Sequence, residues 1–183
     1  MIGEITTKQV QQDKYWDKSR VYTFDEYFKL AEKAPFKTEF LNGKVRSVPN
    51  GTINHVAICG SLYFYLKTAI KVSKIKALSA LSELRIHIEP INESTYPDCS
   101  ITLGEPEYYR KDKAITNPSI LFEVLSDSTG SYDRGEKFRT YKYLSSFREY
   151  ILIEQDQPAI DVLYKNEVWE MQSFIGLDDV LIL

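Results

Sequence analysis

The sequence of 183 residues is poor in the residue types that build disulfide frameworks and zinc sites. It contains two cysteines, Cys59 and Cys99, and two histidines, His55 and His87. The cysteines lack metal-ligand spacing and are too few for a disulfide scaffold. The sequence therefore indicates a reduced, cytoplasmic setting and argues against a zinc site rich in histidine.

Long apolar runs and a strong charge of one sign are also absent. No stretch approaches the roughly 20 apolar residues that span a bilayer, and residues 1–6 lack the charged-then-apolar pattern of a signal peptide. We expect no membrane partner. The formal net charge of −3 does not indicate nucleic-acid binding, although a local basic patch can provide it.

The composition is that of one globular domain with a sizeable core. Hydrophobic residues make up 43% and charged residues 27% of the chain, as in ordinary soluble proteins. Residues 1–20 are polar and without a clear period, so we interpret them as a lead-in. Residues 21–183 are predicted to form a single domain.

The first predicted helix has a clear start and a clear end. Thr23 followed by Glu26 matches a capping box, in which each side chain binds a backbone amide of the other residue. Apolar residues recur at helical spacing over residues 24–33, and Pro35 ends the pattern.

A β-hairpin is predicted directly after this helix. Asn42-Gly43 separates two extended runs, residues 38–41 and 44–48, and this dipeptide suits the positive φ angles of a type I′ turn. Glu39 lies on the first strand. By itself, Glu39 is best interpreted as an exposed carboxylate on a strand.

The longest predicted helix covers residues 53–72 and leads into a basic stretch. No acidic residue occurs from Val56 to Ser82, and the lysines of this stretch are Lys67, Lys71, Lys74 and Lys76. Such a stretch can contact phosphates, but we interpret it as a solvated helix face, because local charge alone is weak evidence. His55, near the helix start, is interpreted as a capping or packing residue.

Two further strands and a loop follow. Residues 77–88 read as extended, and residues 96–103 form a strand that Pro97 marks as a beginning or an edge. In that strand the alternation places Asp98, Ser100 and Thr102 on the face opposite the apolar residues. Residues 104–118 are predicted to be a polar loop.

The most informative strand covers residues 119–125 and contains a single carboxylate, Glu123, within an apolar run. Such a run indicates a strand covered on both faces, where a carboxylate needs a partner or a cation. The partner candidates are Asp98, Glu39 and Lys137. The alternative is a Glu on an open face, or one paired with a single Arg or Lys.

A helix over residues 134–145 is predicted next, with Asp133 as N-cap and Glu136 completing a capping box. Lys137 lies at the edge of its apolar stripe, from where its ammonium can reach the end of the strand that carries Glu123. A strand over residues 149–153 and a terminal hairpin complete the fold. The order of the elements predicts a mixed α/β domain.

Glu39, Asp98, Glu123 and Lys137 together suggest a chemistry. Carboxylate oxygens with open water positions suit Mg²⁺ or Mn²⁺, and such an ion can activate water for phosphodiester cleavage. A nearby lysine can orient that water or neutralise developing negative charge. Each feature alone is common, whereas the combination is more specific.

The sequence resembles the Uma2-type (DUF820-like) restriction endonuclease family of the PD-(D/E)xK nuclease superfamily, over roughly residues 21–172. The motifs that carry the resemblance are YTFDEY at 22–27, EFLNG at 39–43, YPD at 96–98, FEVLSDST at 122–129, YDRGEKF at 132–138 and REYILI at 148–153.

The resemblance implies a restriction-endonuclease-like core, with a mixed central sheet flanked by helices, an N-terminal helix-hairpin and a C-terminal β-hairpin. It implies Asp98 and Glu123 as metal ligands and Glu39 as an additional acid. The superfamily's usual lysine, two positions after the second acid, is replaced by Leu125. Lys137 is the match from the following helix.

Two functions follow as expectations. The first is a Mg²⁺- or Mn²⁺-dependent DNA endonuclease that acts as a homodimer, as the resemblance implies for cutting a duplex. The second is a catalytically silent nuclease fold that binds nucleic acid or another protein. The intact acids and Lys137 favour the first, whereas the modest charge and the lack of a separate DNA-reading module keep the second open.

Overall fold

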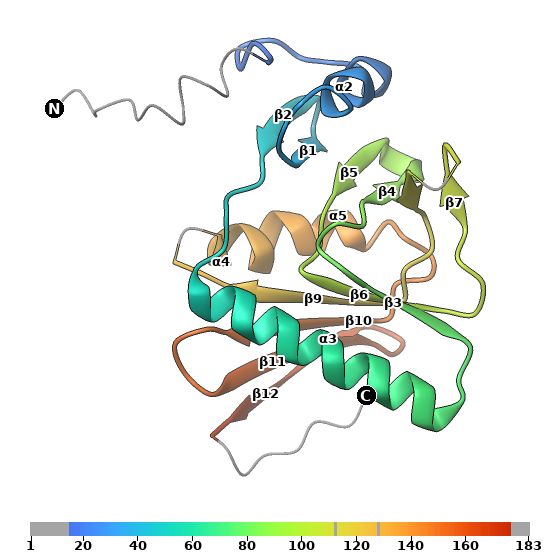
Figure 1. Cartoon of the computed structure of the whole chain (residues 1–183), viewed down its shortest axis with the longest axis vertical. Coiled ribbons are helices and arrows are strands. Elements are labelled where there is room, and N and C mark those ends of the chain that lie inside the picture. Colours follow the sequence, from blue (N-terminus) through green and yellow to red (C-terminus); the bar gives the residue numbers. More distant parts are fainter. Residues whose placement is uncertain (1–14, 112, 128, 177–183) are drawn as a thin grey trace, which may run out of the picture.

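The fold is a mixed α/β arrangement of two β-sheets with helices packed on them (Figure 1). The computed structural model describes residues 15–111, 113–127 and 129–176, and each sheet has six strands within this part of the chain. We call the sheet that contains the Glu123 strand the main sheet and the other one the second sheet.

The main sheet contains the predicted strands of the C-terminal half. Its order is β12 (Trp169–Ile175), β11 (Ala159–Lys165), β10 (Glu149–Glu154), β9 (Ile120–Leu125), β6 (Cys99–Leu103) and β3 (Ala77–Leu81). β9 and β10 run parallel, and the other neighbours are antiparallel. β9 therefore lies in the interior of the sheet.

The second sheet contains the N-terminal hairpin. Its order is β2 (Lys44–Ser47), β1 (Thr38–Leu41), β5 (Glu93–Thr95), β4 (Ile86–Ile88), β8 (Ala114–Ile115) and β7 (Tyr108–Tyr109), and the 3₁₀ turn Glu89–Ile91 joins β4 to β5. The hairpin turns at Asn42 and Gly43, with φ angles of 49° and 73°, as the Asn-Gly signal predicts.

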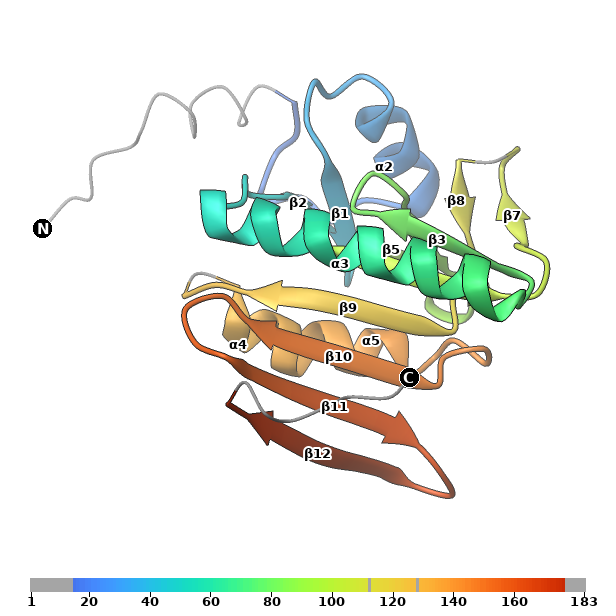
Figure 2. The same cartoon turned by 60° about the horizontal axis from the view of Figure 1, so that its bottom comes forward.

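The helices cover both faces of the main sheet (Figure 2). α3 (Ile53–Ser73) lies on one face, where Leu66 packs in a core with residues of β6, β9, β10 and β11. α4 (Gly130–Tyr132), a π-helical turn (Asp133–Lys137) and α5 (Phe138–Tyr141) lie on the other. On that side Tyr141 and Leu144 pack with Leu121 and Leu125 of β9 and with isoleucines of β4 and β8.

A third core holds the N-terminal elements on the second sheet. α2 (Phe24–Ala31) starts with the predicted capping box of Thr23 and Glu26, and its aromatic residues pack against β1 and β2. Trp16, in the predicted lead-in, is buried and stacks edge-on against Phe36. Residues 1–14 lie outside the described part of the chain. In the described residues, no helix combines the length and apolar character needed to cross a membrane.

The predicted order of elements is largely confirmed, with three corrections. Residues 77–88 are not one strand but β3 and β4, which a turn directs into different sheets. The predicted loop 104–118 contains the short strands β7 and β8. The sequence also did not predict that the N-terminal hairpin pairs with β5 in a second sheet, separate from the sheet that contains β9.

The third correction concerns the helix that carries Lys137. Helical structure begins at Gly130 rather than at residue 134, and Asp133 is buried inside it instead of capping it. The capping-box pattern of Asp133 and Glu136 is therefore wrong as a helix start. Pattern alone did not reveal this, because buried acids and capping acids share the same sequence signal.

Candidate functional site

Glu123 is the buried carboxylate at the centre of the site. It lies on β9 with 2% of its surface exposed, on the face that also presents Leu121 and Leu125 to α5. Its Oε2 accepts a hydrogen bond from Lys137 Nζ at 2.8 Å, and its Oε1 accepts one from the Tyr141 hydroxyl at 3.1 Å. The predicted contact between Glu123 and Lys137 is thus present, and Glu123 does not lie on an open face.

Lys137 provides the positive charge of the site and is itself 5% exposed. Its ammonium also donates to the Tyr96 carbonyl at 3.0 Å and lies 3.4 Å from Asp133 Oδ1 and 3.9 Å from Glu39 Oε1. Burial alone would lower the pKa of Lys137, but the surrounding carboxylates, Glu123 foremost, outweigh it and hold that pKa well above its usual range. Lys137 is therefore charged.

The helical turn that presents Lys137 has π geometry over Asp133–Lys137. One extra residue per turn is rare in helices and is found frequently at functional sites. Here it places Asp133 and Lys137 on the same buried side, and the Tyr150 hydroxyl from β10 donates to the Asp133 carbonyl at 3.0 Å. Asp133 is a site residue that the sequence suggested only as a cap.

Glu39 joins this cluster from the second sheet. It is buried, so its interpretation as an exposed strand carboxylate is excluded. Its Oε1 accepts hydrogen bonds from the Thr95 hydroxyl and from the Tyr96 backbone amide at 3.2 Å. Its Oε2 accepts one from the Tyr132 hydroxyl at 3.1 Å. The cluster thus lies where the two sheets and the π turn meet.

Asp98 lies directly before β6, next to Glu123 on the neighbouring strand. Its backbone amide donates to Phe122 O at 3.1 Å, which continues the antiparallel register of β6 and β9. Residues opposite each other in such a register are close neighbours on one face. Its Oδ2 accepts from the Val124 amide at 2.8 Å and contacts His55 Nε2 at 3.0 Å.

His55 contacts Asp98, and the sequence analysis did not assign it to the site. Its hydrogen bond to Asp98 raises the pKa of His55 to about 10, so the ring is protonated at neutral pH. Burial would raise the pKa of Asp98, but the bond from His55 leads the effects that lower it overall. The ring's other nitrogen, Nδ1, lies 3.7 Å from Cys59 Sγ.

The grouping of potential ligands differs from the predicted one. In the part of the chain that the structure describes, the one group of three such side chains with ligand atoms within 4.8 Å of one another is His55, Cys59 and Asp98. Glu39, Asp98 and Glu123 do not converge in this way, and Lys137 contacts two of them. The spacing of His55 and Cys59 places both on one helix face, but it gives no sign that Asp98 meets them.

Acidic groups outnumber basic groups in this region. The four carboxyl groups are those of Glu39, Asp98, Glu123 and Asp133, whereas the basic groups in contact with them are Lys137 and His55. Burial, followed by the charges of Asp133 and Asp98, raises the pKa of Glu123 well above its usual value despite the attraction of Lys137. A hard cation, which prefers oxygen ligands, would balance the charge of these acidic groups.

One cavity, of about 510 Å³, lies next to the site but not in it. Its lining includes Asn42, Glu93, Glu136 and Thr140, and none of the four predicted site residues.

Comparison with known proteins places the chain in one family. The family profile described as "Uma2: Putative restriction endonuclease" matches residues 24–183. The uncharacterized protein sll1609 of Synechocystis sp. (strain PCC 6803) is 30% identical over 161 residues, covering 86% of this chain and 90% of the relative. A second one from that organism, slr1290, is 31% identical over 143 residues, covering 78% and 74%.

A crystal structure of another protein has a similar fold. The DUF820 protein from Anabaena variabilis ATCC 29413 superposes with a TM-score of 0.69, at 22% identity and with 88% of each chain covered. At this identity the likeness concerns the fold alone.

The ion pairs of Lys137 generate a prediction about stability. Lys137→Met leaves buried carboxylates without their cation and should lower the free energy of unfolding by about 3–5 kcal/mol near neutral pH. Glu123, whose pKa burial raises, then binds a proton more readily in the folded than in the unfolded chain. The loss should therefore be largest at high pH and shrink as the pH falls.

Urea unfolding at about pH 8 and at about pH 5 measures this difference. Lys142→Met, at an exposed lysine of the same helical segment, should change stability by no more than about 0.5 kcal/mol. An equal, small loss for both variants at both pH values would show that Lys137 does not compensate buried charge.

Proposed function

The chain belongs to the Uma2 family, and from this membership we propose that it is a Mg²⁺- or Mn²⁺-dependent DNA endonuclease with a restriction-endonuclease-like core. The observation that carries the proposal is the buried contact of 2.8 Å between Lys137 and Glu123, next to Asp98 on the adjacent strand. In this proposal, Asp98, Glu123 and Lys137 are the two acids and the lysine of a metal-dependent nuclease site.

The residues fit a divalent metal by their chemistry. Asp98 and Glu123 would hold it, with Glu39 as a third acid, because carboxylate oxygens are preferred by Mg²⁺ and Mn²⁺ and the site carries excess negative charge. When bound there, the ion would activate a water molecule and neutralise charge on the phosphate.

The chain's own groups would position the reaction. Tyr141 and Lys137 fix the two oxygens of Glu123, while the Val124 amide and His55 fix Asp98. Lys137, charged and buried, is placed to hold the attacking water or to stabilise the negative charge that develops on the phosphate. Asp98 and His55 are more exposed than Glu123 and Lys137, so a phosphate would approach from their side.

One observation favours a second candidate function. Lys137 and Glu123 already satisfy each other within a closed network of hydrogen bonds, which is also what a purely structural buried ion pair would show. In that case the chain would be a silent nuclease fold that binds nucleic acid or protein. Cleavage assays separate the two candidates.

Supercoiled plasmid provides the test of the endonuclease. With Mg²⁺ or Mn²⁺ the wild-type protein should convert it to nicked and linear forms, and chelation by EDTA should stop the reaction. Asp98→Asn and Glu123→Gln should each slow nicking by roughly 100-fold or more, since each removes a charge that stabilises the reaction.

Glu89→Gln, at an exposed acid of the 3₁₀ turn between β4 and β5, is the matched control and should nick as fast as the wild type. Nicking that continues unchanged in both site variants would exclude Asp98 and Glu123 as its source. Absence of nicking with every DNA form tried would support the silent fold.

Cutting both strands of a duplex calls for two active sites, so we propose that the chain acts as a homodimer on DNA. The terminal hairpin β11–β12, where Val168 and Met171 are exposed, is the candidate interface. The aromatic residues of α2, which the sequence also suggested, are buried against β1 and β2. Light scattering at assay concentration should give twice the 21.2 kDa of one chain. A mass of one chain under conditions that cut both strands would contradict this arrangement.

A further inference from the structure

α3 carries more exposed surface than its position on the main sheet requires. Cys59 and Leu66 are the buried members of this 21-residue helix, and its outward face includes Phe64, whose surface is 64% exposed. Lys67 follows Phe64 by three residues, and Lys71 follows Lys67 by four. All three side chains therefore project from one side of the helix. Lys74, at the C-cap, extends the row. We call Lys67, Lys71 and Lys74 the α3 lysine row.

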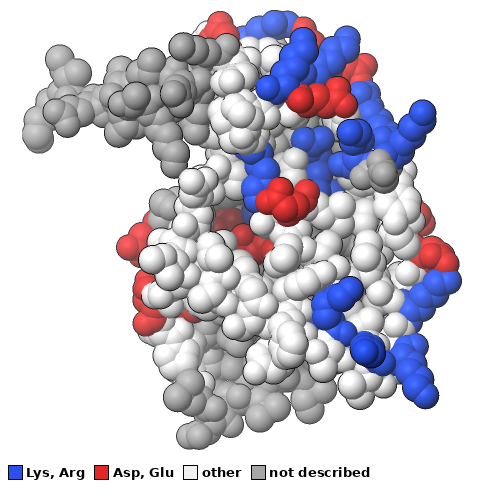
Figure 3. Space-filling model, in the orientation of Figure 1, with Lys and Arg blue, Asp and Glu red and all other residues white. Residues whose placement is uncertain are grey.

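The charge of this surface is of one sign. No acidic residue occurs from Val56 to Ser82, and all three members of the α3 lysine row are exposed. Within the described residues Lys71 and Lys74 have no acidic partner, whereas the nearby Lys76 pairs with Glu105. Figure 3 shows Lys and Arg side chains toward the C-terminal end of α3 and uncharged side chains over its N-terminal half.

The same helix begins at the proposed active site. His55, in its first turn, contacts Asp98, and Lys71 lies sixteen residues further along, or about 24 Å at the rise of an α-helix. Successive lysines of the row are separated by about 4.5–6 Å of helix axis. Each DNA strand carries one phosphate per roughly 3.4 Å of duplex axis.

We propose that the α3 lysine row binds the phosphate backbone of duplex DNA and guides the strand along α3 toward Asp98. This inference rests on the proposed function for its substrate class. The spacing places the row about seven base pairs from the reacting phosphate. The row therefore supplies affinity that does not depend on sequence, while the acidic cluster, which repels phosphate, supplies the reaction.

A uniformly basic row is better matched to a polyanion than to an uncharged partner. Lysine ammonium groups gain their interaction with DNA by releasing its condensed counterions. The net charge of −3 would otherwise oppose DNA binding, so a local basic surface is needed for the chain to approach its substrate.

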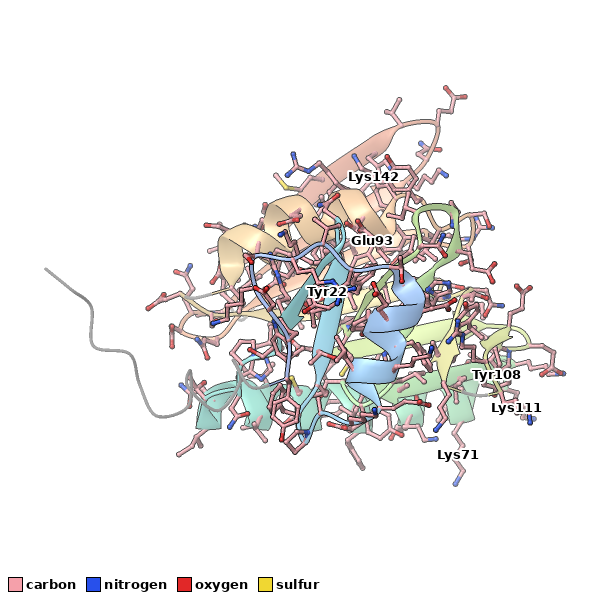
Figure 4. The ribbon with its side chains drawn as sticks, turned by 90° about the horizontal axis from the view of Figure 1, so that it is seen from above. Tyr22, Lys71, Glu93, Tyr108, Lys111 and Lys142 are labelled. Carbon is pink, nitrogen blue, oxygen red and sulfur yellow. The ribbon has the colours of Figure 1, made fainter. Side chains whose placement is uncertain are left out.

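The test compares two triple variants that change the net charge equally. Lys67→Glu, Lys71→Glu and Lys74→Glu remove the α3 lysine row. Lys29→Glu, Lys33→Glu and Lys142→Glu alter exposed lysines on other elements and form the control. Figure 4 shows Lys71 and Lys142 pointing away from opposite sides of the molecule. Circular dichroism verifies that both variants fold.

Fluorescence anisotropy with a labelled duplex in EDTA, at several salt concentrations, measures binding separately from cleavage. The row variant should bind roughly tenfold or more weakly than the wild type at low salt. The slope of log K against log salt should become shallower by about 1 for each phosphate that the variant no longer neutralises. The control variant should keep most of the affinity and the full slope.

The outcomes separate this proposal from the endonuclease itself. A wild type that nicks plasmid while both variants show the same reduced affinity and slope would overturn the α3 proposal and leave the nuclease intact. Binding that depends on the row without any nicking would support the proposal and count against catalysis. The α3 proposal would also be overturned if the row variant bound DNA as the wild type does but had lost another property of the wild type. That property would be binding to phosphatidylserine vesicles or self-association in light scattering.

Discussion

Burial of a carboxylate on an interior strand is the constraint on which the site depends. Glu123 is taken out of water by β9, so it needs a compensating charge, and Lys137 provides one at 2.8 Å. An isolated charge in this position would cost several kcal/mol. The helix that follows β9 must therefore bring a cation to this point, and its π turn over Asp133–Lys137 does so.

Carboxylates from both sheets meet at the site, and the basic groups there do not balance all of them. Glu39 from the second sheet and Asp98 from the edge of β6 add negative charge that Lys137 and His55 balance only in part. Such an imbalance is costly in a protein that has no ligand for it, which is why we connect it with a divalent cation. Structural stability and catalysis would then draw on the same residues, so substitutions here affect both.

Much of the fold could be predicted from local signals. The capping box at Thr23, the Asn42-Gly43 turn and the apolar run of β9 each depend on a few neighbouring residues, and the structure confirms all three. Lys137 was one of three candidate partners of Glu123, because it lies at the edge of the apolar stripe of its helix, and the structure shows this contact.

The remaining features depend on tertiary structure. The approach of His55 to Asp98 joins a helix start to a strand edge, and the burial of Asp133 follows from a π turn that no periodicity encodes. The division of residues 77–88 between two sheets likewise depends on which edges are free for pairing. The roles of Glu39, Asp98, Glu123 and Lys137 in metal binding stay predictions.

Calorimetric titration of Mn²⁺ into the wild-type chain and into Glu123→Gln tests the central claim most directly, because it measures the ion without requiring the correct DNA. We expect saturable binding to the wild type and none to the variant, with both proteins equally folded by circular dichroism. Equal binding by both proteins would place the ion elsewhere, and no binding by the wild type would leave the buried Glu123–Lys137 pair as a structural feature alone.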